Sequence, residues 1–131
     1  MKSLVVEDEL TSRIMLQSVL SKLGECHSAV NGKEAVEAVQ MASDSAQPYD
    51  LICMDIKMPR MSGVEAVRQI RGIEEANGVV STRGAKIIMV TAVETPQALI
   101  QSFNALCDEY LVKPLDAGKL LEKLRKLGVI E

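Results

Sequence analysis

The stretch DLICMD, residues 50–55, holds four consecutive apolar residues with an acidic residue at each end. A run of this length has the size of a β-strand. Because it is apolar on both faces, it is typical of a strand in a parallel sheet that helices cover on both sides. Asp55 follows the apolar run, at the carboxyl end of the strand, where open parallel sheets bind their ligands. The stretch therefore predicts an α/β fold with a polar site at Asp55.

Outward from this strand, short apolar runs alternate with helical periodicity in both directions. Gly24 stops the first helical segment, Thr95 is expected to cap the fourth, and Asp116 the last. The chain of 131 residues fits one domain. The alternation predicts an open, doubly wound parallel sheet. We expect strands at 4–6, 26–30, 50–54, 85–90 and 110–112, and helices at about 14–23, 33–42, 64–76, 96–106 and 117–127.

Composition excludes several function classes. The formal net charge is −3 and only 2% of residues are aromatic, with no Trp, which argues against a nucleic-acid-binding module. No apolar run has the length of a membrane span, and the amino terminus becomes acidic too early for a signal peptide. The three cysteines are widely spaced, which is typical of reduced thiols. We expect a soluble, cytoplasmic protein that binds neither nucleic acid nor membrane.

Residues whose side chains can react or bind a ligand follow four of the predicted strands. Glu7 and Asp8 come after the first strand, Asp55 after the third, Thr91 after the fourth and Lys113 after the fifth. Since the carboxyl ends of parallel strands share one edge of the sheet, these side chains are expected to converge. Each residue alone has an ordinary structural explanation, such as a helix cap or a solvated charge. Their joint occurrence at the strand ends favours a site.

The residue types at this edge suit phosphoryl chemistry. Clustered carboxylates repel one another unless a cation lies among them, and oxygen ligands of this kind suit Mg²⁺. A carboxylate such as Asp55 can form an aspartyl phosphate. Thr91 can then donate a hydrogen bond to a phosphoryl oxygen, and Lys113 can neutralise its charge.

Other candidates are weaker. His27 lies within a strand without a metal-binding partner, so we interpret it as structural or at the surface. Cys53 is flanked by apolar residues and is interpreted as an inert core thiol. Neither of the common nucleotide-binding glycine loops, GxxxxGK[ST] and GxGxxG, is present.

Four blocks of the chain resemble the receiver domains of two-component response regulators, of the stand-alone, chemotaxis CheY-like kind. The blocks are LVVEDE at 4–9, MDIKMPRMSG at 54–63, VTA at 90–92 and KP at 113–114. The resemblance spans essentially the whole chain. It implies a flavodoxin-like, three-layer sandwich with strand order 2-1-3-4-5 and five helices, forming one receiver domain over 1–131 with no effector domain.

The resemblance also implies roles for individual residues. Asp55 would be the phosphoacceptor. Asp8 and Asp55 would ligate Mg²⁺ together with the backbone carbonyl of Lys57, and Glu7 would contact the metal, often through water.

The same resemblance makes Thr91 and Lys113 the residues that bind the phosphoryl group. Tyr110 matches an aromatic residue that turns inward when Thr91 moves, which would remodel the surface of the fourth helix, fifth strand and fifth helix. The chain departs from the family pattern at Glu7, where Asp is more frequent. Lys57 and Val93 occupy positions that tune dephosphorylation, and we expect them to give a long-lived phosphoryl state.

The implied partners are a sensor histidine kinase or histidine phosphotransfer protein as phosphodonor, and a downstream protein as target, with a homodimer as a further option. The chain is not expected to be an enzyme beyond its own phosphorylation and dephosphorylation. A phosphorylation-independent docking module is one alternative. An aspartyl-nucleophile phosphatase is another, but it usually has a second Asp where Lys57 stands. A flavodoxin would need a Ser/Thr-rich phosphate loop, which is absent after the first strand.

Overall fold

The computed structural model describes residues 1–58, 60–79, 83–92 and 107–131. Their backbone forms a five-stranded sheet with the order β2-β1-β3-β4-β5. Every neighbouring pair of strands is parallel, which confirms the predicted topology. The strands are β1 (Ser3–Val6), β2 (Cys26–Ala29), β3 (Leu51–Asp55), β4 (Lys86–Thr91) and β5 (Glu109–Val112).

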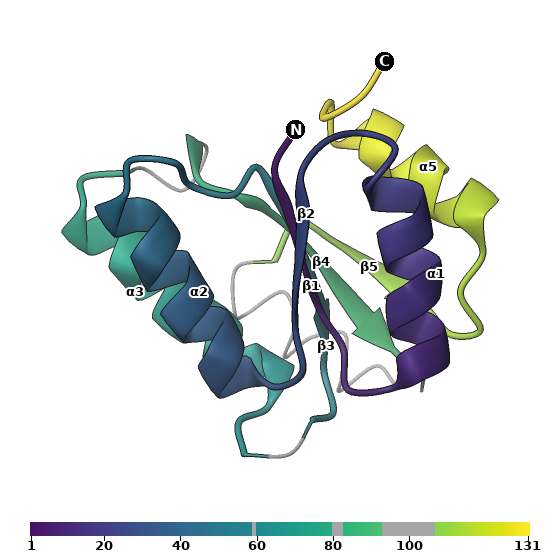
Figure 1. Ribbon diagram of the computed structural model, residues 1–131, viewed down its shortest axis with the longest axis horizontal. Coiled ribbons are helices and arrows are strands. Elements are labelled where there is room, and N and C mark those ends of the chain that lie inside the picture. Colours follow the sequence, from purple (N-terminus) through teal and green to yellow (C-terminus); the bar gives the residue numbers. More distant parts are fainter. Residues whose placement is uncertain (59, 80–82, 93–106) are drawn as a thin grey trace.

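Helices cover both faces of this sheet. They are α1 (Leu10–Leu20), α2 (Gly32–Asp44), α3 (Gly63–Ala76) and α5 (Ala117–Lys126). Figure 1 shows α1 and α5 on one face and α2 and α3 on the other, which gives the expected three layers. Four of the five expected helices are therefore present in the described ranges. The helix expected at 96–106, with its cap at Thr95, lies outside the described residues.

Two apolar clusters form the core, one on each side of the sheet. Alternate residues of β3 divide between them: Ile52 and Met54 pack toward α2 and α3, whereas Leu51 and Cys53 pack toward α1 and α5. All four side chains are fully buried. This burial on both faces is the reason why the strand has no polar alternation.

Local capping explains where three helices begin. The Asn31 side chain accepts a hydrogen bond from Glu34 N at 2.9 Å, and Ser62 Oγ accepts one from Glu65 N at 3.3 Å. Asp116 Oδ1 accepts from Gly118 N at 2.6 Å, which confirms the predicted cap. Among the described residues, no helix has both the length and the apolar character needed to cross a bilayer.

Candidate functional site

The predicted site residues lie at the carboxyl edge of the sheet. Glu7 and Asp8 directly follow β1, and Lys113 directly follows β5. Asp55 and Thr91 were expected after their strands, but each is the last residue of its strand, β3 and β4. Their backbone groups still pair with the neighbouring strand, since Thr91 is in register with Val112. The sheet thus positions both side chains rigidly.

Three carboxylates come together at this edge. One oxygen each of Glu7, Asp8 and Asp55 lies within 4.8 Å of the others. Glu7 and Asp55 are buried, whereas Asp8 is exposed. Among the described residues, Lys113 is the only cation paired with the buried Glu7 Oε1. Three clustered carboxylates beside this one ammonium leave an excess of negative charge, which fits a divalent cation with oxygen ligands.

Lys113 supplies the positive charge of the cluster. Its Nζ lies 2.9 Å from Glu7 Oε1 and 3.6 Å from Asp55 Oδ2. Burial favours the neutral amine, but the contact with Glu7 and the charge of Asp55 outweigh burial and raise the pKa of Lys113. The ammonium therefore stays charged beside the carboxylates at neutral pH.

The Asp55 carboxyl is hard to ionise in this setting. Burial, followed by the contact with the Glu7 carboxyl and its charge, raises the pKa of Asp55 to about 7. Lys113 and the backbone N–H of Lys57, 3.3 Å from Oδ1, act in the opposite direction. An additional cation would therefore stabilise the carboxylate form of Asp55.

Two contacts that hold the site were missed by the sequence analysis. Gly63 N donates to Ile56 O at 2.9 Å, and a Cβ on Gly63 would lie 2.1 Å from the backbone oxygen of Asp55. Only glycine allows α3 to start so close to the end of β3. Arg13 Nη1 of α1 donates to the Glu7 carbonyl at 3.1 Å. A glycine at the start of a helix was a visible signal, whereas nothing in the sequence singled out Arg13.

The expected switch residues lie on β4 and β5. Thr91 is buried, and its carbonyl accepts a hydrogen bond from Lys113 N at 2.7 Å. Tyr110 is half-buried, with the Lys123 ammonium of α5 5.3 Å from the centre of its ring. Of the surface expected to change, β5 and α5 are described. The fourth helix and Val93 lie outside the described residues.

The residues set aside as structural behave as expected. His27 Nδ1 lies 2.7 Å from the Tyr49 hydroxyl, and its Nε2 lies 2.9 Å from a Glu25 oxygen. Cys53 is fully buried, and burial raises the pKa of its thiol to about 12, which makes it unreactive. Both interpretations are confirmed.

Comparison with known families gives a consistent picture. The family model of the response regulator receiver domain matches residues 3–125. The chemotaxis protein CheY of Thermotoga maritima is 32% identical over 127 residues, covering 95% of each chain. The sensory/regulatory protein RpfC of Xanthomonas campestris is 33% identical, but the chain spans only 17% of its length.

Solved structures agree with the fold. The receiver domain of the histidine kinase CKI1 from Arabidopsis thaliana, complexed with Mg²⁺ and BeF₃⁻, has a TM-score of 0.83 at 30% identity and covers 98% of this chain and 90% of its own. The receiver domain of Saccharomyces cerevisiae Ssk1, co-crystallised with the histidine phosphotransfer protein Ypd1, belongs to a structure with a TM-score of 0.84 at 31% identity, covering 98% and 89%.

Proposed function

We propose that this chain, which belongs to the response regulator receiver domain family, accepts a phosphoryl group on Asp55 and thereby changes how it binds a partner protein. Receiver domains are signalling modules of two-component systems. The observation that carries the proposal is the buried Asp55 carboxyl, which lies beside Glu7 and Asp8 and 3.6 Å from the Lys113 ammonium. This arrangement combines a nucleophile, a cation site and a positive charge at one strand edge.

The carboxylates of Glu7, Asp8 and Asp55, with the backbone carbonyl of Lys57, would hold a Mg²⁺ ion. When bound, the ion would neutralise charge on the carboxylates and on the phosphoryl oxygens. The cluster of three carboxylates and the raised pKa of Asp55 both support a cation at this place. Glu7 is fully buried, so it contributes charge from beneath the site, whereas the exposed Asp8 faces the incoming group.

In the transfer step, an Asp55 carboxylate oxygen forms the bond to phosphorus while the P–N bond of a phosphohistidine breaks. The electron pair of that bond returns to the ring nitrogen, and because the other ring nitrogen of the phosphohistidine carries a proton, the imidazole leaves as the neutral ring. Lys113 stabilises the charge on the phosphoryl oxygens, and the Thr91 hydroxyl donates a hydrogen bond to one of them. The chain acts only on its own phosphorylation and dephosphorylation.

Phosphorylation would then bias a two-state surface. The phosphoryl group adds about −1.5 to −2 charge and three acceptor oxygens, which draw Thr91 toward Asp55. Tyr110 lies on β5, the strand paired with β4, and would turn inward as Thr91 moves. Tyr110 would leave its contact with Lys123 on α5, so the partner would meet a different surface.

A histidine kinase or a histidine phosphotransfer protein would supply the phosphoryl group. Leu10 and Ile14 are one helical turn apart on α1 and remain 59% and 54% exposed. Leu10 is the first residue of α1, two residues after Asp8, and Ile14 lies one turn further along, which makes them a suitable apolar contact for the donor protein. Replacing both with serine is expected to slow transfer from a phosphorylated donor protein at least about tenfold, whereas labelling by a small phosphodonor stays unchanged.

The direct test is the intact mass of the protein after incubation with acetyl phosphate. Wild type should gain one phosphoryl group with Mg²⁺ and none after chelation, and Asp55→Asn should gain none. Asp50→Asn, at the other end of β3, is the matched control and should be labelled like wild type. If wild type gains no phosphoryl group under any condition, a phosphorylation-independent docking module becomes the better explanation. A cytoplasmic location and a homodimer stay predictions.

A further inference from the structure

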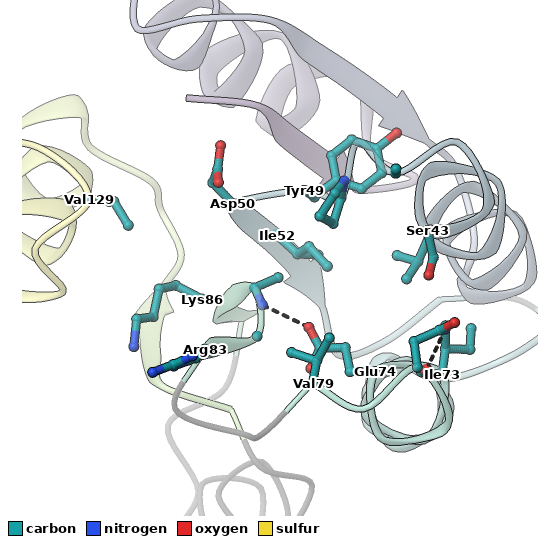
Figure 2. Close-up of a pocket in the computed structure, with 16 residues that line it drawn as sticks. Ser43, Tyr49, Asp50, Ile52, Ile73, Glu74, Val79, Arg83, Lys86 and Val129 are labelled. Atoms are coloured by element: carbon teal, nitrogen blue, oxygen red, sulfur yellow. Dashed lines mark hydrogen bonds between the residues drawn. The ribbon is translucent and has the colours of Figure 1, made fainter.

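A cavity lies at the opposite end of the sheet from Asp55. It has a volume of about 690 Å³ and lies where α2 and α3 end and β3 and β4 begin. Its floor is apolar, since Val39, Ile52 and Ala85 are at most 8% exposed and belong to the core. Figure 2 shows this pocket with Ile52 at its centre and Tyr49 beside it. A preformed pocket of this size with an apolar floor is typical of a small-molecule site.

Of the two acidic side chains at this pocket, Glu74 has both oxygens paired within the protein and Asp50 has one. Glu74 Oε2 accepts a hydrogen bond from Ala85 N at 2.7 Å, and Glu74 Oε1 pairs with the buried Arg71 at 2.7 Å. Asp50 Oδ2 accepts a hydrogen bond from Lys2 N at 2.8 Å. The Glu74 carboxylate therefore has little capacity left to bind a cationic ligand, whereas the exposed Asp50 keeps its other oxygen available.

The two basic side chains at the pocket are in the opposite situation. The side chains of Arg83 and Lys86 form no hydrogen bond or ion pair with any residue in the described part of the chain. In Figure 2 both lie at the same end of the pocket, on the side of Val129, with Ser43 and Ile73 at the other end. The pocket thus offers two free cations at one end of an apolar floor, in a protein whose net charge is −3.

We propose that this pocket binds a small organic carboxylate with an apolar body. The carboxylate would pair with Arg83 and Lys86, whose donors suit a charged acceptor. The apolar body would cover the floor formed by Ile52 and its neighbours. Asp50 precedes β3 and Asp55 ends it, so the two sites lie at opposite ends of one strand. The inference does not depend on phosphorylation.

The proposal can be tested with 4-phenylbutyrate as the probe and amide resonances of ¹⁵N-labelled protein as the readout. Shifts are expected for Ile52, Glu74 and Ala85, which line the pocket. 4-Phenylbutylamine and 4-phenylbutanol have the same apolar body without the negative charge, and acetate has the charge without the body. All three should bind at least about tenfold more weakly than 4-phenylbutyrate.

A charge-reversed variant distinguishes this site from general attraction of anions. Arg83→Glu combined with Lys86→Glu should lose at least about tenfold in affinity for 4-phenylbutyrate and gain affinity for 4-phenylbutylamine. Lys22→Glu with Lys119→Glu changes the net charge equally at remote positions and should bind like wild type. The proposal is overturned if the lining amides do not shift at about 10 mM probe. It is equally overturned if the amine and the carboxylate bind alike, or if both double variants behave alike.

Discussion

Replacing Arg71 with methionine should destabilise this protein more than any ordinary surface substitution. Arg71 lies on α3 and is only 8% exposed. Its guanidinium donates to Glu74 Oε1 at 2.7 Å, to the Ala85 carbonyl at 2.8 Å and to Asp108 Oδ2 at 3.0 Å. The residue thereby ties α3 to the segments that precede β4 and β5. Methionine keeps the apolar stem and removes all of these donors.

The magnitude follows from what the substitution leaves behind. Removing one partner of a buried ion pair typically costs about 3–5 kcal/mol, because the other charge loses its compensation. Here Glu74 and Asp108 each keep one backbone donor, Ala85 N at 2.7 Å and Ile87 N at 2.8 Å. Their side chains are also 14% and 25% exposed, so water can reach them. We therefore expect the lower end, about 3 kcal/mol, which corresponds to a Tm lower by about 10 °C.

Urea unfolding followed by far-UV circular dichroism is the suitable assay, because the chain has no Trp for fluorescence. Arg68→Met is the matched control on the same helix. Arg68 is 55% exposed, and its contact with Glu65 is 3.9 Å long, so its loss should cost less than about 0.5 kcal/mol. A free energy of unfolding for Arg71→Met within about 1 kcal/mol of wild type would refute the reasoning.

Two further predictions concern the start of α3 beside Asp55 and the ion pairs between β5 and α5. Gly63→Ala should lower stability by about 1–3 kcal/mol and slow labelling by acetyl phosphate, because a Cβ there would meet Asp55 O at 2.1 Å. Gly72→Ala has open space and should stabilise the protein by up to about 1 kcal/mol without changing labelling; equal effects of the two would contradict this account. Burial acts to raise the pKa of Glu109, but bonds from Lys126, Tyr110 N and Lys123 outweigh it and lower that pKa below 4.5. The stability that Glu109 contributes is therefore present above pH 4.5 and is lost as the pH falls through the lowered pKa. The difference in unfolding free energy between wild type and Glu109→Gln should therefore become smaller as the pH is lowered. If this difference in unfolding free energy does not change with pH, the ion pairs of Glu109 with Lys123 and Lys126 do not contribute as described.

Much of the fold could be predicted because its signals are local. The β3 stretch is apolar over four residues since each of its faces packs against a helix layer. Asn31, Ser62 and Asp116 act on backbone groups two or three residues away, so the predicted starts of α2, α3 and α5 lie within one residue of the observed ones. The helix expected at 14–23 was placed wrongly, because α1 spans Leu10–Leu20 and its N-cap, Glu9, makes no side-chain capping bond that would mark its start. Each predicted strand differs from the observed one by one residue at one or both ends; at Asp55 and Thr91, pairing with a neighbouring strand extends β3 and β4 by one residue.

The candidate site was predictable for a related reason. In a parallel sheet the carboxyl ends of all strands face one edge, so the order of residues along the chain already brings Glu7, Asp55 and Lys113 together. Their protonation could not be predicted in the same way. Burial and the Glu7 contact raise the pKa of Asp55, and both depend on distances between strands that are far apart in the sequence.

The sequence by itself determined the alternation of strands and helices, the helix caps and the set of groups at the carboxyl edge, because periodicity and strand ends are properties of short segments. Only the tertiary structure decided that Arg71 is buried against Glu74 and Asp108, that Gly63 has no room for a side chain, and that Arg83 and Lys86, unpaired among the described residues, lie at an apolar pocket. These features depend on which segments pack against each other and at what distance. Burial and charge pairing are properties of that packing, so a single strand or helix does not contain them.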